Sequence, residues 1–153
     1  MKENVKNTVR RILDNYLETN HRRKTSERYA ILDTVYSMGG HFTLEQLEAC
    51  LIERKFFVCR ATLYNTLRLF IELRLIMRHH LLDGTRYEAC YANSNHCHQI
   101  CTVCGKVTEI HVPNIARAVE NVHLKRFRKD GFSLYIYGVC SACQGKITRG
   151  ITV

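Results

Sequence analysis

The sequence predicts an α+β protein made of two small domains, and three observations support this fold class. Apolar residues recur at helical spacing up to about residue 73, two β-compatible runs follow, and His and Cys become dense beyond residue 95. The composition, 46% hydrophobic and 24% charged, is typical of a globular protein. The change in character predicts a domain boundary near residues 91–95, which divides the chain into 1–92 and 93–153.

The first two helices are predicted from apolar periodicity and helix-end signals. Apolar residues at helical spacing place the first helix from Val5 to Leu17. A second helix should begin after Thr25 or Ser26, because either hydroxyl can cap a helix N-terminus. Gly39 is expected to end it.

A third and a fourth helix should complete the N-terminal bundle. Thr43, with Gln46 three residues later, forms a capping-box pattern at the start of the third helix. The fourth should run from about Arg60 to Leu73, with one apolar stripe for the core and a separate polar face. That polar face is a candidate surface for a partner.

A β-hairpin is expected next. The runs Leu75 to Leu82 and Thr85 to Ala92 are joined by Asp83-Gly84, a strong signal for a tight turn. Helices followed by a hairpin describe a winged helix-turn-helix domain. In the second domain we expect strands at His96 to Cys101 and Lys106 to Ile110, a helix from Pro113 to about Phe127, and a last strand at Phe132 to Val139.

The charge and the apolar pattern limit the possible partners and the compartment. A net charge of +9 makes nucleic acid a candidate partner, because Lys and Arg neutralise phosphates. No apolar run approaches the roughly 20 residues needed to span a bilayer, and the N-terminus lacks a signal-peptide core. We therefore expect a cytoplasmic protein, in which eight cysteines are metal ligands or reduced thiols rather than disulfides.

Two cysteine pairs form the strongest chemical signal. Cys101-x-x-Cys104-Gly-Lys and Cys140-x-x-Cys143 together supply four thiolates, which match the closed tetrahedral shell of structural Zn²⁺. The rival interpretation is a redox dithiol, but a thioredoxin-like motif would use one pair only. The remaining cysteines have no spacing partner and are expected to be small buried hydrophobes, with a redox role left open: Cys50, Cys59, Cys90 and Cys97.

A second metal-binding pattern precedes the first cysteine pair. On a strand, the period of two places His96 and His98 on one face, so that both imidazoles can approach one ion. A carboxylate from a neighbouring strand could complete the shell, and the residues grouped with this pair are His41, Glu88 and Glu109. By spacing alone, ordinary surface histidines remain the alternative.

Two segments suit DNA. The exposed face of the fourth helix suits insertion into the major groove, and its candidate contact residues are Arg60, Thr62, Tyr64 and Asn65. The basic stretch before the second helix suits phosphate contacts, and its residues are Arg22, Arg23 and Lys24. A winged helix that binds protein instead is the competing interpretation.

Taken together, three motifs resemble the ferric uptake regulator family of metal-dependent transcription factors, in the family's order and over roughly residues 22–145. They are Arg60-Ala-Thr-Leu-Tyr64-Asn65, His96-x-His98-x-x-Cys101-x-x-Cys104-Gly-Lys-Val-x-Glu109 and Tyr135-x-Tyr137-Gly-x-Cys140-x-x-Cys143. The resemblance implies an N-terminal winged helix, a small C-terminal α/β dimerisation domain, and a homodimer that binds a palindromic double-stranded operator.

The resemblance also implies a regulatory metal, Fe²⁺ first, at the hinge between the domains. Its ligands would be the residues that match the family's positions one by one: His41, Glu88, His96, His98 and Glu109. An ion with ligands on both domains would favour the conformation that aligns two winged helices with the operator. Metal affinity and DNA affinity would then be reciprocally coupled.

The chain departs from the family in two places. A third metal site, frequent in the family, would use positions that lack the usual ligands here, so we expect it to be absent: Asn95, Cys97, Ala116 and Phe132. Asn65 follows Tyr64 where iron-sensing members often carry Arg, whereas peroxide-sensing members resemble this Asn. The operator preference therefore need not be that of the iron-sensing members.

The predicted function is a metal-responsive repressor of metal (iron) homeostasis genes, not an enzyme. Alternatives within the family are zinc-, manganese- or haem-responsive regulators and a peroxide sensor. The peroxide sensor is ranked second because the last ligand position holds Glu109 rather than Asp. From other classes, a metal-dependent hydrolase lacks an HExxH or deaminase motif here. A zinc-stapled protein-interaction module is the third possibility.

Overall fold

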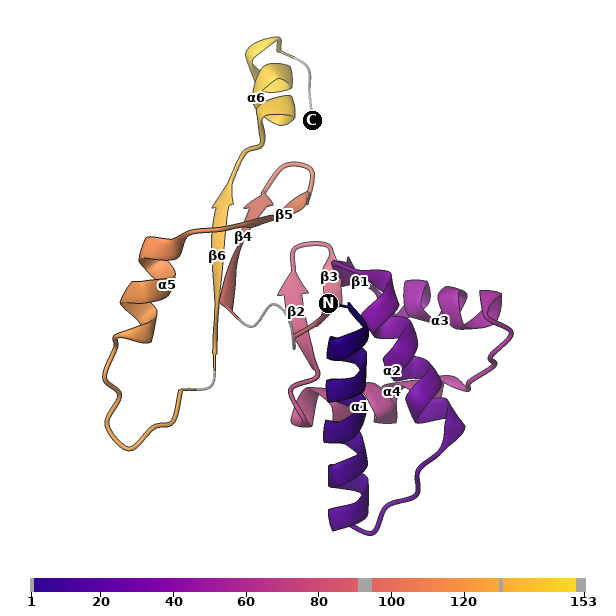
Figure 1. Ribbon diagram of the computed structural model, residues 1–153. Helices are drawn as coiled ribbons and strands as arrows, with labels where there is room; N and C mark the ends of the chain where they lie inside the picture. The colour runs from indigo at the N-terminus through magenta and orange to yellow at the C-terminus, as the bar shows by residue number, and fades with distance from the viewer. Residues whose placement is uncertain (1, 91–94, 130, 151–153) are drawn as a thin grey trace. The chain divides into compact units, whose positions relative to one another are not determined.

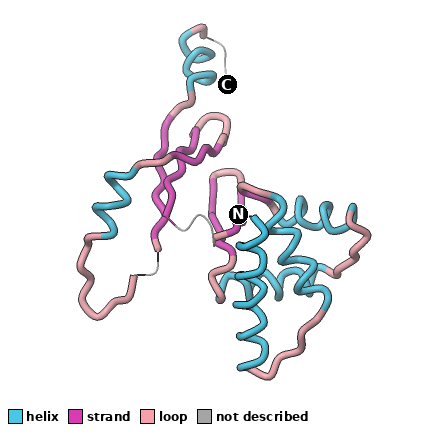
Figure 2. Tube along the Cα trace, in the orientation of Figure 1, coloured by secondary structure: helices cyan, strands magenta, loops and turns pink. Residues whose placement is uncertain are grey.

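The computed structural model describes residues 2–90, 95–129 and 131–150 (Figure 1). The chain divides into two compact units, Met1–Ala92 and Asn93–Val153. Helices predominate in the first unit, whereas strands form the centre of the second (Figure 2). Within the described residues, none of the helices combines the length and the apolar character needed to cross a membrane.

Four helices form most of the first unit, as the sequence predicts: α1 (Lys2–Thr19), α2 (Ser26–Met38), α3 (Leu44–Glu53) and α4 (Arg60–Glu72). The capping box is formed, since the Gln46 amide N–H donates to Thr43 Oγ1 (3.2 Å) and the Thr43 N–H donates to Gln46 Oε1 (2.8 Å). Gly39 ends α2 with φ +69°, a conformation that favours glycine. Thr25 occupies the N-cap position of α2, but its side chain makes no capping hydrogen bond.

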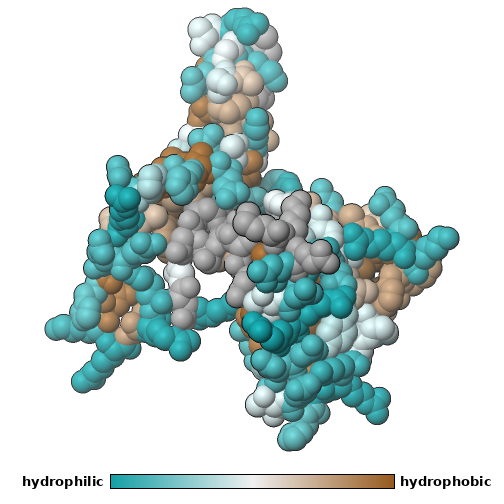
Figure 3. Space-filling view, in the orientation of Figure 1, coloured by the Kyte–Doolittle hydropathy of each residue, from teal (hydrophilic) through white to brown (hydrophobic). Residues whose placement is uncertain are grey.

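The core of the first unit is a cluster of seventeen buried hydrophobic side chains that draws on all four helices and the adjoining strands. The predicted stripe of α4 is part of it, because Leu63, Leu67 and Phe70 are almost fully buried. Each such side chain stabilises the fold by roughly 1.5–3 kcal/mol. Hydrophilic side chains cover most of α1 in the space-filling view, which is the amphipathic arrangement expected of a surface helix (Figure 3).

The hairpin forms a three-stranded antiparallel sheet with one short extra strand. The strands are β1 (His41–Phe42), β2 (Ile76–Leu81) and β3 (Gly84–Ala89), in the order β1-β3-β2. The predicted turn at Asp83-Gly84 is wrong by one residue: Leu81 pairs with Gly84, so the turn residues are 82 and 83. Gly84 instead opens β3 with φ +122°, which an L side chain rarely adopts.

The second unit contains a mixed sheet and two short helices: β4 (Asn95–Cys101), β5 (Val107–Ile110), α5 (Pro113–Glu120), β6 (Phe132–Gly138) and α6 (Ser141–Thr148). The strand order is β5-β4-β6, with β4 antiparallel to β5 and parallel to β6. The prediction that the helix after Pro113 reaches Phe127 is wrong. It ends at Glu120, where Lys129 Nζ donates to the backbone carbonyls of Val119 and Glu120, so the chain leaves the helix with these acceptors satisfied.

Candidate metal centres and DNA interface

A tight backbone turn carries the first cysteine pair where β4 leads into β5. The Cys101 N–H donates to the Lys106 carbonyl and the Gly105 N–H donates to the Cys101 carbonyl, each at 2.9 Å. Gly105 makes this tight turn possible with φ +71°. On the other side, Cys140 is the N-cap residue of α6 and Cys143 lies in its first turn. The two predicted cysteine pairs therefore come from two separate backbone turns of the same unit.

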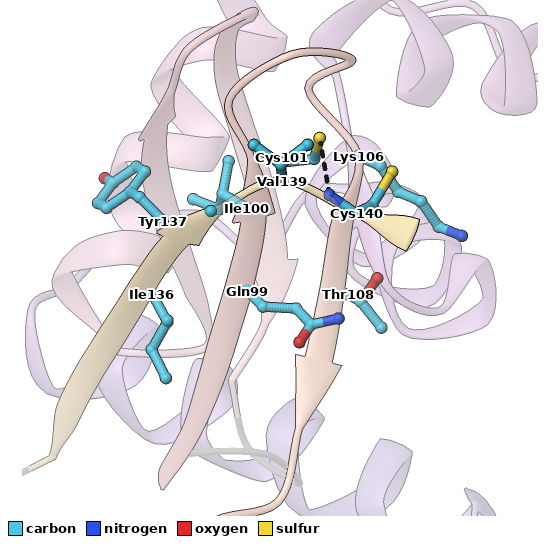
Figure 4. Close-up of a pocket in the computed structure, with 10 residues that line it drawn as sticks. Gln99, Ile100, Cys101, Lys106, Thr108, Ile136, Tyr137, Val139 and Cys140 are labelled. Atoms are coloured by element: carbon cyan, nitrogen blue, oxygen red, sulfur yellow. Dashed lines mark hydrogen bonds between the residues drawn. The ribbon is translucent and has the colours of Figure 1, made fainter. Parts of the chain in front are cut away.

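The four sulfur atoms lie at the spacing that a tetrahedral metal requires. All four are within 4.8 Å of one another, and Cys104 Sγ is 3.8 Å from Cys140 Sγ. Zn–S bonds of about 2.3 Å in tetrahedral geometry place two sulfurs about 3.8 Å apart. The Cys140 N–H also donates to Cys101 Sγ at 3.3 Å, the dashed line in Figure 4. These residues fit structural Zn²⁺.

The electrostatics of the cluster also favour a cation. Backbone N–H groups of Cys140 and Cys104 lower the pKa of the Cys101 thiol to about 6. Hydrogen bonding to the Cys140 sulfur, followed by burial, raises the pKa of Cys143 to about 12. Four thiols this close cannot all ionise by themselves, whereas a divalent cation stabilises every thiolate that it binds.

A second cluster lies within the first unit, on the sheet of the wing. Each strand contributes one side chain that could bind a metal: His41 from β1, His79 from β2 and Glu88 from β3. Glu88 Oε2 lies 3.0 Å from His79 Nε2 and 3.4 Å from His41 Nε2. His79 and Glu88 are buried, and the two imidazoles meet edge to face with ring centroids 5.1 Å apart. Imidazole and carboxylate donors suit Fe²⁺, Mn²⁺ and Zn²⁺.

Sequence reasoning found His41 and Glu88 but missed His79. The register pairs His41 with Glu88 and Met77 with Glu88, so His79 is a diagonal neighbour of Glu88 across the β2–β3 ladder. The signal was present in the sequence. Residues 79 and 88 are joined through a two-residue turn, and either candidate turn position places both side chains on one face of the hairpin.

The other predicted ligands belong to the second unit. His98 is buried on β4, and its ring stacks on Tyr135 of β6 with centroids 5.5 Å apart. His98 is paired with Glu109 of β5, so both side chains project from the same face of this sheet. Glu109 is exposed. The backbone of His96 belongs to β4, but its side chain lies outside the described residues.

The DNA-binding candidates on α4 are solvent-accessible. Arg60, Tyr64 and Asn65 are exposed, with Tyr64 at 51%, and Thr62 is half-buried. A hollow of about 520 Å³ lies between α4 and the segment before α2. Its walls bring together three arginines, polar side chains and two carboxylates that are distant in sequence: Arg22, Thr25, Glu27, Arg28, Thr62, Asn65, Arg68 and Glu72. Arg28, on α2, was not among the predicted contacts.

Carboxylates hold two of the predicted basic contacts. Lys24 is exposed and forms ion pairs with Asp14 and Glu18 of α1, and the first of these spans 3.4 Å. Arg60 lies 3.2 Å from Glu45 and 3.4 Å from Glu48, both on α3. Arg22 and Arg23 are exposed, and the Arg22 guanidinium lies over the Tyr16 ring. DNA would have to compete with the α1 carboxylates for Lys24 and with the α3 carboxylates for Arg60.

The four remaining cysteines do not all behave as buried hydrophobes. Cys97 is buried, and Cys50 and Cys90 are half-buried. Burial raises the pKa of Cys90 to about 12. For Cys59 the expectation of burial is wrong, because it is exposed at the N-cap of α4. Its Sγ lies 3.1 Å from Thr62 Oγ1, and this hydrogen bond lowers the pKa of the thiol.

The fold and its two clusters define a metal-binding protein. Its first unit is a winged helix-turn-helix, and its second unit carries a four-cysteine metal site. The model of the ferric uptake regulator family matches residues 19–137, and the chain belongs to this family of metal-responsive transcription regulators. It is 32% identical over 127 residues to the ferric uptake regulation protein of Neisseria meningitidis serogroup A, which covers 82% of this chain and 88% of that protein.

One further relative agrees with this family, and one solved structure shows the same fold. It is 34% identical over 127 residues to the peroxide operon regulator of Bacillus subtilis, with 81% of this chain and 86% of that protein covered. The solved structure of the Helicobacter pylori ferric uptake regulator superimposes with a TM-score of 0.72 over 94% of each chain, at 23% sequence identity. The predicted family and fold class are confirmed.

Proposed function

We propose that this protein is a cytoplasmic, homodimeric repressor of metal homeostasis genes, and that a divalent metal, Fe²⁺ first, controls its binding to double-stranded operator DNA. Structural Zn²⁺ would be held by the four clustered cysteines. The regulatory ion would be held by His41 and Glu88 of the wing together with His96, His98 and Glu109 of the second unit. No residue is assigned a catalytic role.

The observation that carries this proposal is the position of His41 and Glu88 on the wing of the DNA-binding unit. Their sheet shares one hydrophobic core with α4, since Phe42, Ile76 and Tyr87 belong to the same buried cluster as Leu67. Close-packed interiors transmit displacement rather than absorb it. A ligand that fixes the wing therefore also fixes the orientation of α4.

The ion supplies a positive charge that imidazole and carboxylate ligands from both units can share. His41 and Glu88 would orient the wing toward it, and His98 would orient β4, in which it is anchored by stacking on Tyr135. Binding that needs ligands from both units selects conformations in which the two winged helices of a dimer match a palindromic operator. Metal removal would release that restraint.

On the DNA side, the proposed contacts fall into two groups. Arg22, Arg23 and Lys24 would contact phosphates, which sets affinity and its dependence on salt. Base edges in the major groove would be read from α4, by Arg60, Thr62, Tyr64 and Asn65. The hollow between these two groups, lined by residues of both, supports their acting as one surface.

Operator binding by the full-length protein tests this proposal. The probe is a duplex selected by the metal-loaded protein from a random library, and affinity is measured by gel shift for apo protein and for protein with Fe²⁺ under anaerobic conditions. We expect Fe²⁺ to raise affinity at least tenfold, and we expect His41→Ala to abolish the increase while zinc content stays unchanged. His123→Ala, at an exposed histidine, is the control. Metal-independent binding by the wild type would refute the proposal.

A peroxide sensor is the second candidate. The similarity to the Bacillus subtilis peroxide operon regulator and the presence of Asn65 on α4 both favour it. In such a sensor, bound Fe²⁺ and peroxide would oxidise a ligand histidine. Mass spectrometry of iron-loaded protein after peroxide treatment decides between the two: added oxygen on a ligand histidine supports the sensor, and unmodified histidines support the iron-responsive repressor.

A further inference from the structure

We propose that His79 is itself a ligand of the regulatory metal, so that the DNA-binding unit supplies three ligands, His41, His79 and Glu88. The inference rests on the proposed function for the regulatory role of the ion. It goes beyond that function by adding His79 as a ligand, so that the wing supplies two nitrogen donors and one carboxylate.

The spacing of the three side chains is compatible with a metal coordination shell as well as with the hydrogen bond that joins His79 to Glu88. With metal–ligand distances of about 2.1 Å, neighbouring donor atoms lie about 3.0 Å apart in octahedral geometry and about 3.4 Å apart in tetrahedral geometry. His79 Nε2 lies 3.0 Å from Glu88 Oε2, and His41 Nε2 lies 3.4 Å from the same oxygen. Both imidazoles therefore present Nε2 to the carboxylate from separate strands.

A hydrogen bond between one histidine and Glu88 does not explain why a second histidine is placed against the same buried carboxylate. The side chains of His79 and Glu88 are 0% and 3% exposed, and that of His41 is 14% exposed. A single histidine would suffice to pair a buried carboxylate. Here two histidines converge on one carboxylate oxygen, with their rings packed edge to face. This convergence of nitrogen and oxygen donors is an arrangement that suits a divalent cation.

The extra imidazole has a consequence for metal selectivity. Nitrogen donors favour later divalent ions of the first transition series over Mn²⁺, whereas a carboxylate-rich shell suits Mn²⁺. A wing with two histidines and one glutamate should therefore discriminate against Mn²⁺ more strongly than a wing with His41 and Glu88 alone. Loss of His79 should weaken Co²⁺ binding more than Mn²⁺ binding.

The competing role for His79 is to orient Glu88 by a hydrogen bond without touching the ion. The variants His79→Ala and His79→Gln separate these roles, because the Gln amide can donate to Glu88 but does not replace an imidazole ligand. Outer residues that only orient a ligand typically cost about 10–100-fold in metal affinity when removed. His80→Ala, at the exposed neighbouring residue of β2, is the matched control.

The experiment uses full-length protein with the zinc site filled and Co²⁺ added as the probe. Affinity is measured by titration, and the proton NMR spectrum records the strongly shifted ring N–H signals of histidines that ligate Co²⁺. We expect His79→Ala and His79→Gln each to lose one such signal and to bind Co²⁺ at least 100-fold more weakly, with His80→Ala unchanged. Near wild-type affinity in His79→Gln with all signals retained would overturn the inference.

Should the His79 variants fail to fold, isotope-labelled wild-type protein gives the answer. Assignment of a Co²⁺-shifted ring signal to His79 supports the inference, and an unshifted His79 ring overturns it. The outcomes also separate this inference from the proposed function. Metal-dependent operator binding with an unligated His79 rejects only the inference. A ligated His79 with metal-independent operator binding rejects only the proposed function.

Discussion

Replacing Cys101 with Ser is expected to unfold the second unit while the first stays folded. Among the described residues, seventeen buried hydrophobic side chains form the core of the first unit, whereas beyond residue 93 Ile100 is the only buried hydrophobic side chain that is not a cysteine. Ile100 contributes roughly 1.5–3 kcal/mol by burial. Structural zinc contributes about 10–16 kcal/mol to the folding of zinc-finger peptides. Whole domains have a free energy of unfolding of only about 5–15 kcal/mol. Loss of the zinc contribution should therefore exceed the total stability of this unit and unfold it.

Hydrogen exchange read by mass spectrometry, together with zinc analysis, measures this effect unit by unit. In Cys101→Ser, peptides from β4 and β6 should exchange at rates close to those of an unfolded chain, and the zinc content should fall from one ion per chain toward zero. Peptides from α4 should keep their protection, because the core around Leu67 and Phe70 is untouched.

Cys50→Ser is the matched control for this experiment, since Cys50 is half-buried and lies outside both metal clusters. It should keep zinc and protection in both units. The reasoning would be refuted by a Cys101→Ser protein that retains zinc and normal protection of β4 and β6. It would also be refuted by a variant that loses protection in both units together, because the two cores would then not be independent.

Three further predictions concern the first unit. Thr43→Ala removes the capping box of α3 and should lower the free energy of unfolding by about 1 kcal/mol, measured by urea denaturation; an unchanged midpoint would contradict the capping role. Cys59 should be alkylated faster at pH 7 in the wild-type protein than in Thr62→Val, because the Thr62 hydroxyl lowers the pKa of the thiol and so raises the thiolate fraction. Equal alkylation rates would count against that cause. Glu45→Gln removes one of the two ion pairs of Arg60 and should strengthen operator binding about 2- to 5-fold at low salt; weaker or unchanged binding in gel shifts would be the contrary result.

Features governed by local chemistry could be read from the sequence. The capping box at Thr43, the glycine stop at Gly39 and the apolar stripe of α4 depend on residues within a few positions of each other. The two cysteine pairs were equally readable, because tetrahedral zinc demands four thiolates and each pair comes from one tight turn. The sulfur spacing of 3.8 Å agrees with that requirement.

Features that depend on distant residues escaped the sequence. β1 has two residues, too few for a periodic signal, and exists as a strand because His41 pairs with Glu88. At the end of α5, the carbonyls of Val119 and Glu120 accept hydrogen bonds from Lys129, nine residues beyond Glu120, a contact that no local pattern indicates. His79 is a different case, because the hairpin pattern carried the signal: either turn position places residues 79 and 88 on one face, and only their contact required the paired strands.

The central claim is that the binding of metal and the binding of operator to the protein are coupled. Measuring each affinity with and without the other partner tests this claim most directly. Metal affinity of the full-length, zinc-containing protein is measured by titration with and without saturating operator duplex. If Fe²⁺ raises operator affinity by a given factor, operator must raise Fe²⁺ affinity by the same factor. We predict a factor of at least ten in both directions. An Fe²⁺ affinity that is the same with and without operator would contradict the account, however tightly the metal binds.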